Sequence, residues 1–160
     1  MRKPNLIILF VLLYSFAGCS QNLECKDFKK GNFYIPNKMD DLNEFTVSFK
    51  DSVYQFMPEI DSTITRTVQV RSENTQIEWA NGIDQGKPKY ELIEWIDDCT
   101  YRLKYDESNQ ELDETEKWIN DNNGIVVSKI RIENNCMLFN AVLTSNEGQV
   151  ISQKGLICKE

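Results

Sequence analysis

Apolar and polar side chains alternate through residues 89–105, and the pattern predicts two antiparallel strands joined at Asp97-Asp98. A two-residue connection there places these pairs on one mostly apolar face: Ile96 with Cys99, Glu94 with Tyr101, Leu92 with Leu103, and Tyr90 with Tyr105. The opposite, wetter face then carries Glu91 opposite Lys104 and Ile93 opposite Arg102. The segment therefore predicts a half-buried β-hairpin.

Two further stretches show the same alternation. A turn at Glu73-Asn74 pairs Val68 with Trp79 and Val70 with Ile77, so that both runs carry apolar groups on one face. A turn at Asn134-Asn135 predicts another apolar face, which pairs Ile132 with Met137, Ile130 with Phe139, Ser128 with Ala141, and Val126 with Leu143. The loop 146–148, with Gly148 at the left-handed position, then sets Leu143 opposite Ile151 and Cys136 opposite Cys158.

Two segments leave alternatives open. Apolar residues in 40–57 fall on one helical face but also alternate, and the weak helix formers there slightly favour strands. In residues 106–121, Ser108 and Glu111 match a capping box, which predicts a short helix with Leu112 and Ile119 turned inward. A solvated acidic loop explains the second segment equally well.

The chain thus contains eight to ten short strands joined mainly by tight turns. Such a chain predicts an all-β fold, an antiparallel meander that closes into a small lipocalin-like barrel or a curled sheet. We find no internal repeat or linker, so residues 25–160 are expected to form a single β domain.

The first residues predict export. Arg2 and Lys3 precede an apolar run over residues 6–16, which is too short to cross a bilayer and ends at Ala17-Gly18-Cys19. This pattern predicts a lipoprotein signal peptide over 1–18, lipidation of Cys19 and a lipidated tether over 19–24. The alternative is an ordinary signal peptide with Cys19 incidental. The residue after Cys19 is Ser20, whereas an Asp at this position would favour retention in the inner membrane. Ser20 therefore predicts the outer membrane of the cell envelope, and it does not indicate which face of that membrane carries the protein.

The net negative charge of the chain limits the classes of binding partner that we expect. The formal net charge of the chain is −7, and removing residues 1–18 takes away two positive charges and no negative ones, which leaves −9. Because nucleic-acid binding depends on Lys and Arg neutralising phosphates, we expect no nucleic-acid partner. The expected partners are the membrane, through the lipid anchor, and an envelope protein or a small apolar ligand.

Cysteine use fits an oxidising compartment. Besides Cys19, the chain holds Cys25, Cys99, Cys136 and Cys158. The register above pairs Cys136 with Cys158 in a cross-strand disulfide, which leaves Cys25 with Cys99. Four free thiols are the alternative; a zinc site is disfavoured by the long spacings and by the absence of His from the sequence.

Candidate chemistry is sparse. With no His in the sequence, the commonest general base is missing, and Asp97-Asp98 is better explained as a turn former. The run 120–124 is rich in oxygen ligands, yet its spacing misses the EF-hand pattern, and a polar turn ending in a left-handed Gly124 explains it more simply. We therefore expect neither an enzyme nor a metal site, and no cofactor.

Aromatic residues are the remaining candidates for binding. Trp79, Trp95 and Tyr101 could line a ligand cavity in a small barrel, although such residues more often fill a core. The hairpin register puts Trp95 on the wetter face opposite Thr100, which indicates either a covered second face or an exposed contact surface. Trp95 is therefore the first candidate for a binding residue.

The chain also resembles small uncharacterised lipoproteins of flavobacterium-like bacteria, from Cys25 to the C-terminus without residues 37–62. The motifs that carry the resemblance are Cys25-x-x-Phe28-x-x-Gly31-x-Phe33, Gln76-x-Glu78 and Trp95-x-x-x-Cys99-x-Tyr101-x-Leu103. The resemblance implies a lipid-anchored, strand-built domain and carries over no site. The sequence as a whole favours a non-enzymatic binding module for an envelope or protein partner, with a carrier of a small apolar ligand as the alternative.

Overall fold

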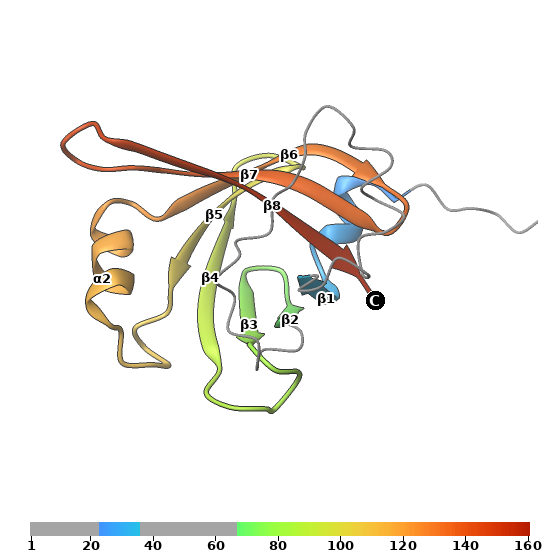
Figure 1. Ribbon diagram of the computed structural model, residues 1–160, viewed down its shortest axis with the longest axis horizontal. Coiled ribbons are helices and arrows are strands. Elements are labelled where there is room, and N and C mark those ends of the chain that lie inside the picture. The colour runs from blue at the N-terminus through green and yellow to red at the C-terminus, as the bar shows by residue number, and fades with distance from the viewer. Residues whose placement is uncertain (1–22, 36–66) are drawn as a thin grey trace, which may run out of the picture.

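The computed structural model describes residues 23–35 and 67–160, which form a closed antiparallel β-barrel (Figure 1). Consecutive strands are neighbours, and the first strand closes the barrel against the last through Phe33–Lys159 and Tyr34–Cys158. The predicted all-β meander is therefore confirmed. The expectations for residues 1–18, for Cys19 and for 40–57 lie outside the described residues.

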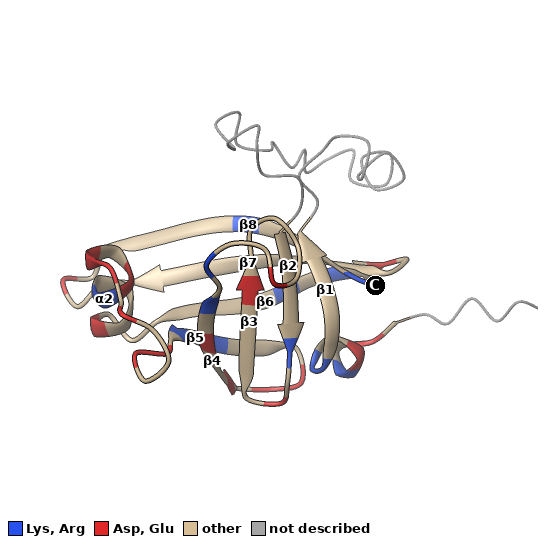
Figure 2. Cartoon of the chain, turned by 90° about the horizontal axis from the view of Figure 1, so that it is seen from below, with Lys and Arg blue, Asp and Glu red and all other residues tan. Residues whose placement is uncertain are grey.

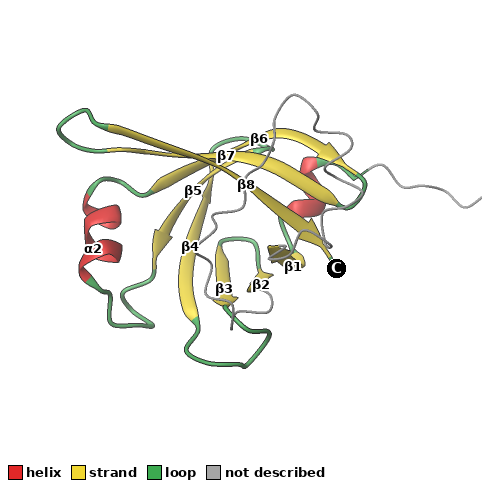
Figure 3. Cartoon of the chain, in the orientation of Figure 1, coloured by secondary structure: helices red, strands yellow, loops and turns green. Residues whose placement is uncertain are grey.

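The strands are β1 (Gly31–Ile35), β2 (Thr67–Arg71), β3 (Thr75–Trp79), β4 (Lys89–Trp95), β5 (Thr100–Tyr105), β6 (Ile125–Glu133), β7 (Cys136–Thr144) and β8 (Val150–Lys159). A 3₁₀ turn, η1 (Cys25–Phe28), precedes them, and a short helix, α2 (Glu114–Asp121), connects β5 to β6. Figure 3 shows the two helical segments apart from each other, on either side of the strands. In the ranges described, we find no helix long and apolar enough to span a membrane.

The end of the barrel next to η1 is closed by side chains. Phe28 and Phe33 are fully buried and stack with their ring centroids 5.8 Å apart, and Met137 and Ile157 complete the cluster. Because the strands are antiparallel, the loops at 72–74, 96–99 and 134–135 gather at this same end. The opposite end carries the loop 80–88, α2 and the β7–β8 turn. The barrel thus has a packed floor beneath η1.

Both predicted disulfides are present. Cys25 and Cys99 are bonded with their Cα atoms 5.1 Å apart, which ties η1 to the β4–β5 loop. Cys136 and Cys158 face each other on β7 and β8 as predicted, with Cα atoms 3.9 Å apart, and they pack with Leu138 and Leu156. Two such bonds are typical of proteins that fold in an oxidising compartment.

The predicted register of the β4–β5 hairpin is wrong by one residue. Trp95 lies opposite Tyr101 and Ile93 opposite Leu103, because the loop holds three residues, 97–99, rather than two. Asp97 shapes this loop by accepting a hydrogen bond from the Cys99 amide at 2.7 Å. A shift of one residue turns the expected apolar face of β4 outward. Leu92 is consequently 44% exposed, and Ile93 is buried at 4%.

A β-bulge changes the β6–β7 register in the same way. The predicted pair Ile132–Met137 is present, but the pairing shifts between Lys129 and Arg131, so that Lys129 faces Phe139. The predicted pairs beyond that point, Ile130–Phe139, Ser128–Ala141 and Val126–Leu143, are therefore wrong. The inserted residue, Ile130, is 44% exposed.

The connection from β5 to β6 contains the short helix, with a different cap from the one predicted. Asp113 accepts a hydrogen bond from the Glu116 amide at 2.8 Å, and Glu116 accepts one from the Asp113 amide at 3.1 Å. Ser108 instead donates through its hydroxyl to Asp106, at 2.6 Å, and forms a turn before the helix. Leu112 is buried as expected. Figure 2 shows Asp and Glu positions, in red, on α2 and in several loops.

A candidate ligand cavity inside the barrel

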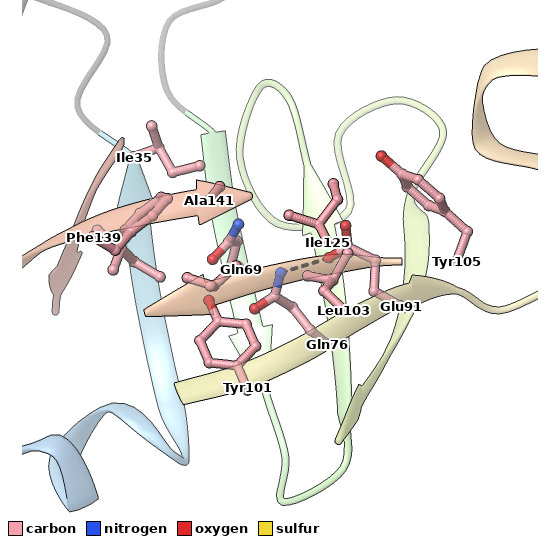
Figure 4. Close-up of a pocket in the computed structure, with 12 residues that line it drawn as sticks. Ile35, Gln69, Gln76, Glu91, Tyr101, Leu103, Tyr105, Ile125, Phe139 and Ala141 are labelled. Carbon is pink, nitrogen blue, oxygen red and sulfur yellow. Dashed lines mark hydrogen bonds between the residues drawn. The ribbon is translucent and has the colours of Figure 1, made fainter. Parts of the chain in front are cut away.

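A cavity of about 160 Å³ lies inside the barrel, with polar side chains on one wall and apolar side chains on the other (Figure 4). The polar wall comes from β2 to β5 and holds Gln69, Gln76, Glu91, Tyr101 and Tyr105. The apolar wall holds Ile35, Leu103, Ile125, Val127, Phe139, Ala141 and Ile157. An enclosed space with a few convergent polar groups is the usual form of a small-molecule site.

The strand register builds the polar wall. Arg71, Gln76, Glu91 and Tyr105 lie directly opposite one another on β2, β3, β4 and β5, and we call these four residues the polar row. Side chains alternate across a strand, so the polar residues of β2 and β3 turn inward while their apolar neighbours turn outward. The predicted β2–β3 register is confirmed, yet its polar face is the one that lines the barrel.

Arg71 anchors the polar row at the floor of the barrel and is only 3% exposed. Its guanidinium donates to Gln76 Oε1 at 2.8 Å, to the Phe28 carbonyl at 2.9 Å and to the Tyr101 hydroxyl at 3.0 Å. It also lies 5.2 Å from the Phe33 ring centroid and 4.7 Å from that of Tyr101. A buried guanidinium with three partners fixes the side chains around it.

Gln76 links Arg71 to Glu91 by hydrogen bonds. The Gln76 side chain is 1% exposed, accepts from Arg71 and donates through Nε2 to Glu91 Oε2. Both ends of the amide are therefore engaged, which fixes the position of the Glu91 carboxyl at the cavity. Figure 4 shows this hydrogen bond as a dashed line between the two side chains.

Burial dominates the electrostatics of the site. It raises the pKa of Glu91 to about 8, with a further contribution from Glu78, against the opposing effects of Gln76 and Arg71. Burial likewise raises the pKa of Glu78, whose carboxylate accepts from Gln69. The pKa of Tyr105 is raised by burial and by the nearby carboxylates, Glu91 first. The carboxyls of Glu78 and Glu91, on adjacent strands, thus share a poorly solvated interior, and Glu91 holds a proton at neutral pH.

Gln69 brings an unsatisfied acceptor to this wall. Its Nε2 donates to Glu78 Oε2 at 2.7 Å, whereas its Oε1 is buried with no hydrogen-bond partner. The side chain is 7% exposed and lines the cavity. A buried carbonyl oxygen without a donor costs free energy, which a bound donor would recover.

An ion pair joins α2 to the barrel beside the cavity. Lys89 Nζ lies 3.0 Å from Glu116 Oε1, and it also lies 5.4 Å from the centroid of the Tyr105 ring. Asn120 of α2 adds two hydrogen bonds to the Tyr105 backbone, at 2.9 and 2.8 Å. The helix therefore supports the strand that carries Tyr105.

Of the binding residues predicted from the sequence, the structure places Tyr101 at the cavity. Trp95 is partly exposed: its ring packs on Tyr101 with centroids 5.0 Å apart, and its indole N–H donates to the Glu73 carbonyl at 2.8 Å, so a binding role for Trp95 stays a prediction. Trp79 is buried, at 8% exposure, on the opposite side of β3 from the cavity. In this structure, Trp95 thus links β4 to Tyr101 and to the loop 72–74 at the floor of the barrel.

The most important cavity residues, Gln69, Gln76 and Glu91, were not identified from the sequence. Their signal was the polar face of the β2–β3 hairpin, where Gln69 faces Glu78 and Arg71 faces Gln76. Facing polar pairs of this kind also occur on solvated hairpins, so the pattern alone does not distinguish an interior from a surface.

The oxygen-rich run at 120–124 serves the fold. Asn120 binds the Tyr105 backbone, and Asn122 Oδ1 accepts from the Asn146 amide at 2.7 Å. Asn123 and Gly124 both have positive φ, 65° and 78°, and a Cβ on Gly124 would collide with the Leu103 carbonyl. Within residues 23–35 and 67–160, no group of three or more His, Cys, Asp or Glu is placed to hold a metal ion.

The chemistry that these residues offer is recognition with proton exchange. Glu91 can give up or take a proton, but the rest of the cavity lining is amide, phenol and hydrocarbon, and the cysteines of the barrel are bonded in pairs. Comparison with protein-family models, with curated proteins and with solved structures finds no match for this chain.

Proposed function

We propose that this protein is an exported, lipid-anchored binding protein whose barrel holds a small molecule with one polar end and one apolar end. The observation that carries the proposal is the two-sided cavity, with Gln69 and Glu91 facing hydrocarbon from β1, β6 and β7. This develops the carrier alternative that the sequence left open. The polar wall of amide and carboxyl groups requires a ligand that is polar in part rather than wholly apolar.

Cavity size limits the ligand. An apolar cavity near 150 Å³ is known to accept a molecule as large as benzene, so about 160 Å³ suits a ligand of roughly five to eight non-hydrogen atoms. The apolar wall would bury the ligand's hydrocarbon part, while the polar wall would orient its head group.

The anchor is supported by the sequence and by the disulfides. The basic start, the short apolar run and Ala17-Gly18-Cys19 favour lipidation of Cys19, and both disulfides suit the cell envelope outside the cytoplasm. Three acyl chains on Cys19 would hold the barrel stably at a membrane. Fatty-acid labelling that is lost in a Cys19→Ser variant tests this part.

Native mass spectrometry of the full chain purified from the cell envelope tests the ligand. We expect an added mass that is released when the protein unfolds, and its loss in Ala141→Leu, which fills the cavity from β7. Val142→Leu is the matched control, because this neighbouring side chain points out of the barrel. Wild-type protein without added mass, or added mass that Ala141→Leu retains, would count against a ligand in the barrel.

A partner-binding module is the second candidate, supported by a different surface. Val150 and Ile151 are 62% and 47% exposed at the start of β8, in a hairpin that extends past the rest of the barrel (Figure 1). Exposed apolar side chains on a projecting hairpin are suited to a protein contact. Crosslinking in cells from these two positions tests this candidate.

A further inference from the structure

The polar wall of the cavity is rich in acceptors. Gln69 Oε1 is buried without a donor, and Glu91 presents a carboxyl that the cavity borders directly. Each amide nitrogen already donates one hydrogen bond to a carboxyl, Gln76 to Glu91 and Gln69 to Glu78. A ligand that supplies N–H groups would complete this wall better than one that supplies acceptors.

The acidic side chains inside the barrel also favour a ligand that carries N–H donors. Glu78 and Glu91 lie on adjacent strands, two residue pairs apart in the register, and both face inward. Arg71 is not among the residues that line the cavity, because its guanidinium is directed to Gln76, Phe28 and Tyr101. A positive charge placed between Glu91 and the apolar wall would therefore meet the Glu91 carboxyl first.

The cationic side chains near Glu91, Arg71 and Lys89, already have hydrogen-bond or ion-pair partners. Lys89, the neighbour of Glu78 on β4, is paired with Glu116 of α2 at 3.0 Å. On β5, the side chains that line the cavity beside Glu91 are those of Tyr101 and Tyr105. Glu91, the carboxyl that lines the cavity, is the group left to receive a charged ligand.

We propose that the cavity takes a small primary ammonium ion with a short apolar tail, which donates to Glu91 and to Gln69 Oε1. This inference rests on the proposed function of the cavity and names its ligand class. The tail lies against Ile125, Val127 and Ala141 on the apolar wall. The ammonium supplies a hydrogen-bond donor to Gln69 Oε1 and a positive charge that favours the ionised form of the Glu91 carboxyl.

Binding is then linked to proton release. The raised pKa of Glu91 keeps a proton on the carboxyl in the empty barrel at pH 6, and the ammonium must displace this proton. Affinity for the cation should rise between pH 6 and pH 8, while affinity for a neutral ligand should change little. The charged groups around Glu91 that enter this balance are Arg71, Glu78, Lys89 and Glu116.

Isothermal titration calorimetry of the full chain with three probes of one size tests the inference: n-butylammonium, n-butanol and n-butanoate. At pH 8 we expect butylammonium to bind at least tenfold more tightly than the other two, with proton release that is visible as a dependence of the measured heat on the buffer. Glu91→Gln should weaken butylammonium at least tenfold, and Gln69→Leu severalfold. Glu94→Gln is the matched control, on the same strand but facing outward beside Arg102, and should change the affinity less than twofold.

The possible outcomes separate the two proposals. If butanol or butanoate binds as tightly as butylammonium, the cation assignment is wrong and a ligand cavity remains. If none of the three binds, the cation assignment is also overturned, and native mass spectrometry of the envelope protein decides the proposed function independently. Because the contrast among probes and the pH profile are measured on wild-type protein, a variant that folds poorly does not prevent the test.

Discussion

Gln76 and Glu91 face each other on β3 and β4, and the Gln76 amide donates to the Glu91 carboxyl inside the barrel. Gln76 in turn accepts from Arg71, which reaches the Phe28 carbonyl at the barrel floor. One chain of hydrogen bonds thus runs from η1 to the cavity. The fold and the proposed ligand site share these side chains, so changes to them should affect both stability and binding.

Stability should fall with rising pH because of Glu91. Its pKa is raised from 4.5 to about 8 in the folded protein, so the folded state holds a proton that the unfolded state releases. The contribution is complete below pH 4.5 and is lost as the pH rises through about 8. Relative to Glu91→Gln, wild-type protein should lose roughly 2–4 kcal/mol between pH 5 and pH 8.5.

Urea unfolding of both proteins across this pH range measures the effect. Glu94→Gln serves as the control, because Glu94 is exposed on the outer face of β4 and pairs with Arg102. The control should follow the wild-type pH profile. A constant difference between wild type and Glu91→Gln at all pH values would show that Glu91 titrates as an ordinary carboxyl.

Arg71 should not tolerate replacement by lysine. A single ammonium cannot reproduce the planar set of contacts to Gln76, Phe28 and Tyr101, and leaves buried acceptors without donors. Arg71→Lys should lower the free energy of unfolding by about 2–4 kcal/mol. Chemical denaturation measures this loss.

The matched control for that prediction is Arg102→Lys. Arg102 pairs with Glu94, whose side chain is 70% exposed, and a surface pair contributes at most about 1 kcal/mol. Equal losses in the two variants would mean that the Arg71 hydrogen bonds do not stabilise the interior.

Neighbouring residues of β4 test the strand register. Ile93 is 4% exposed and Leu92 is 44% exposed, the reverse of what a two-residue turn at Asp97-Asp98 predicts. Ile93→Ala should cost about 2–4 kcal/mol, whereas Leu92→Ala should cost less than about 1 kcal/mol. Thermal and urea unfolding distinguish the two variants. A larger loss of stability for Leu92→Ala than for Ile93→Ala would contradict this register and support the two-residue turn.

The sequence predicted the meander, the β2–β3 register and both disulfides, because each depends on local alternation or on facing cysteines. It failed where one residue changes a register, at the β4–β5 loop and at the bulge around Ile130. It also did not identify Gln69, Gln76 and Glu91 as the polar residues of the cavity. Which face of the β2–β3 hairpin turns inward is decided when the barrel closes through β1 and β8, a contact between distant parts of the chain.

Gly155 and Phe139 control the volume of the cavity from β8 and β7. They are directly opposite each other, and a Cβ on Gly155 would collide with the Phe139 ring, which lines the cavity. Gly155→Ala should therefore destabilise the protein by about 1–3 kcal/mol. Adding Phe139→Leu to Gly155→Ala should restore part of this loss, and a double-mutant cycle of unfolding free energies measures the coupling. Strictly additive losses would show that the two side chains do not touch.

The most direct test of a ligand inside the barrel is methyl NMR of the full chain during titration with n-butylammonium at pH 8. We expect the largest shifts at the methyl groups of Leu103, Ile125 and Val127, which line the cavity. The exposed methyl groups of Leu92, Val150 and Ile151 should shift little. Saturable shifts confined to the exposed set would contradict a ligand site in the barrel and favour the outer surface as the place where this protein binds.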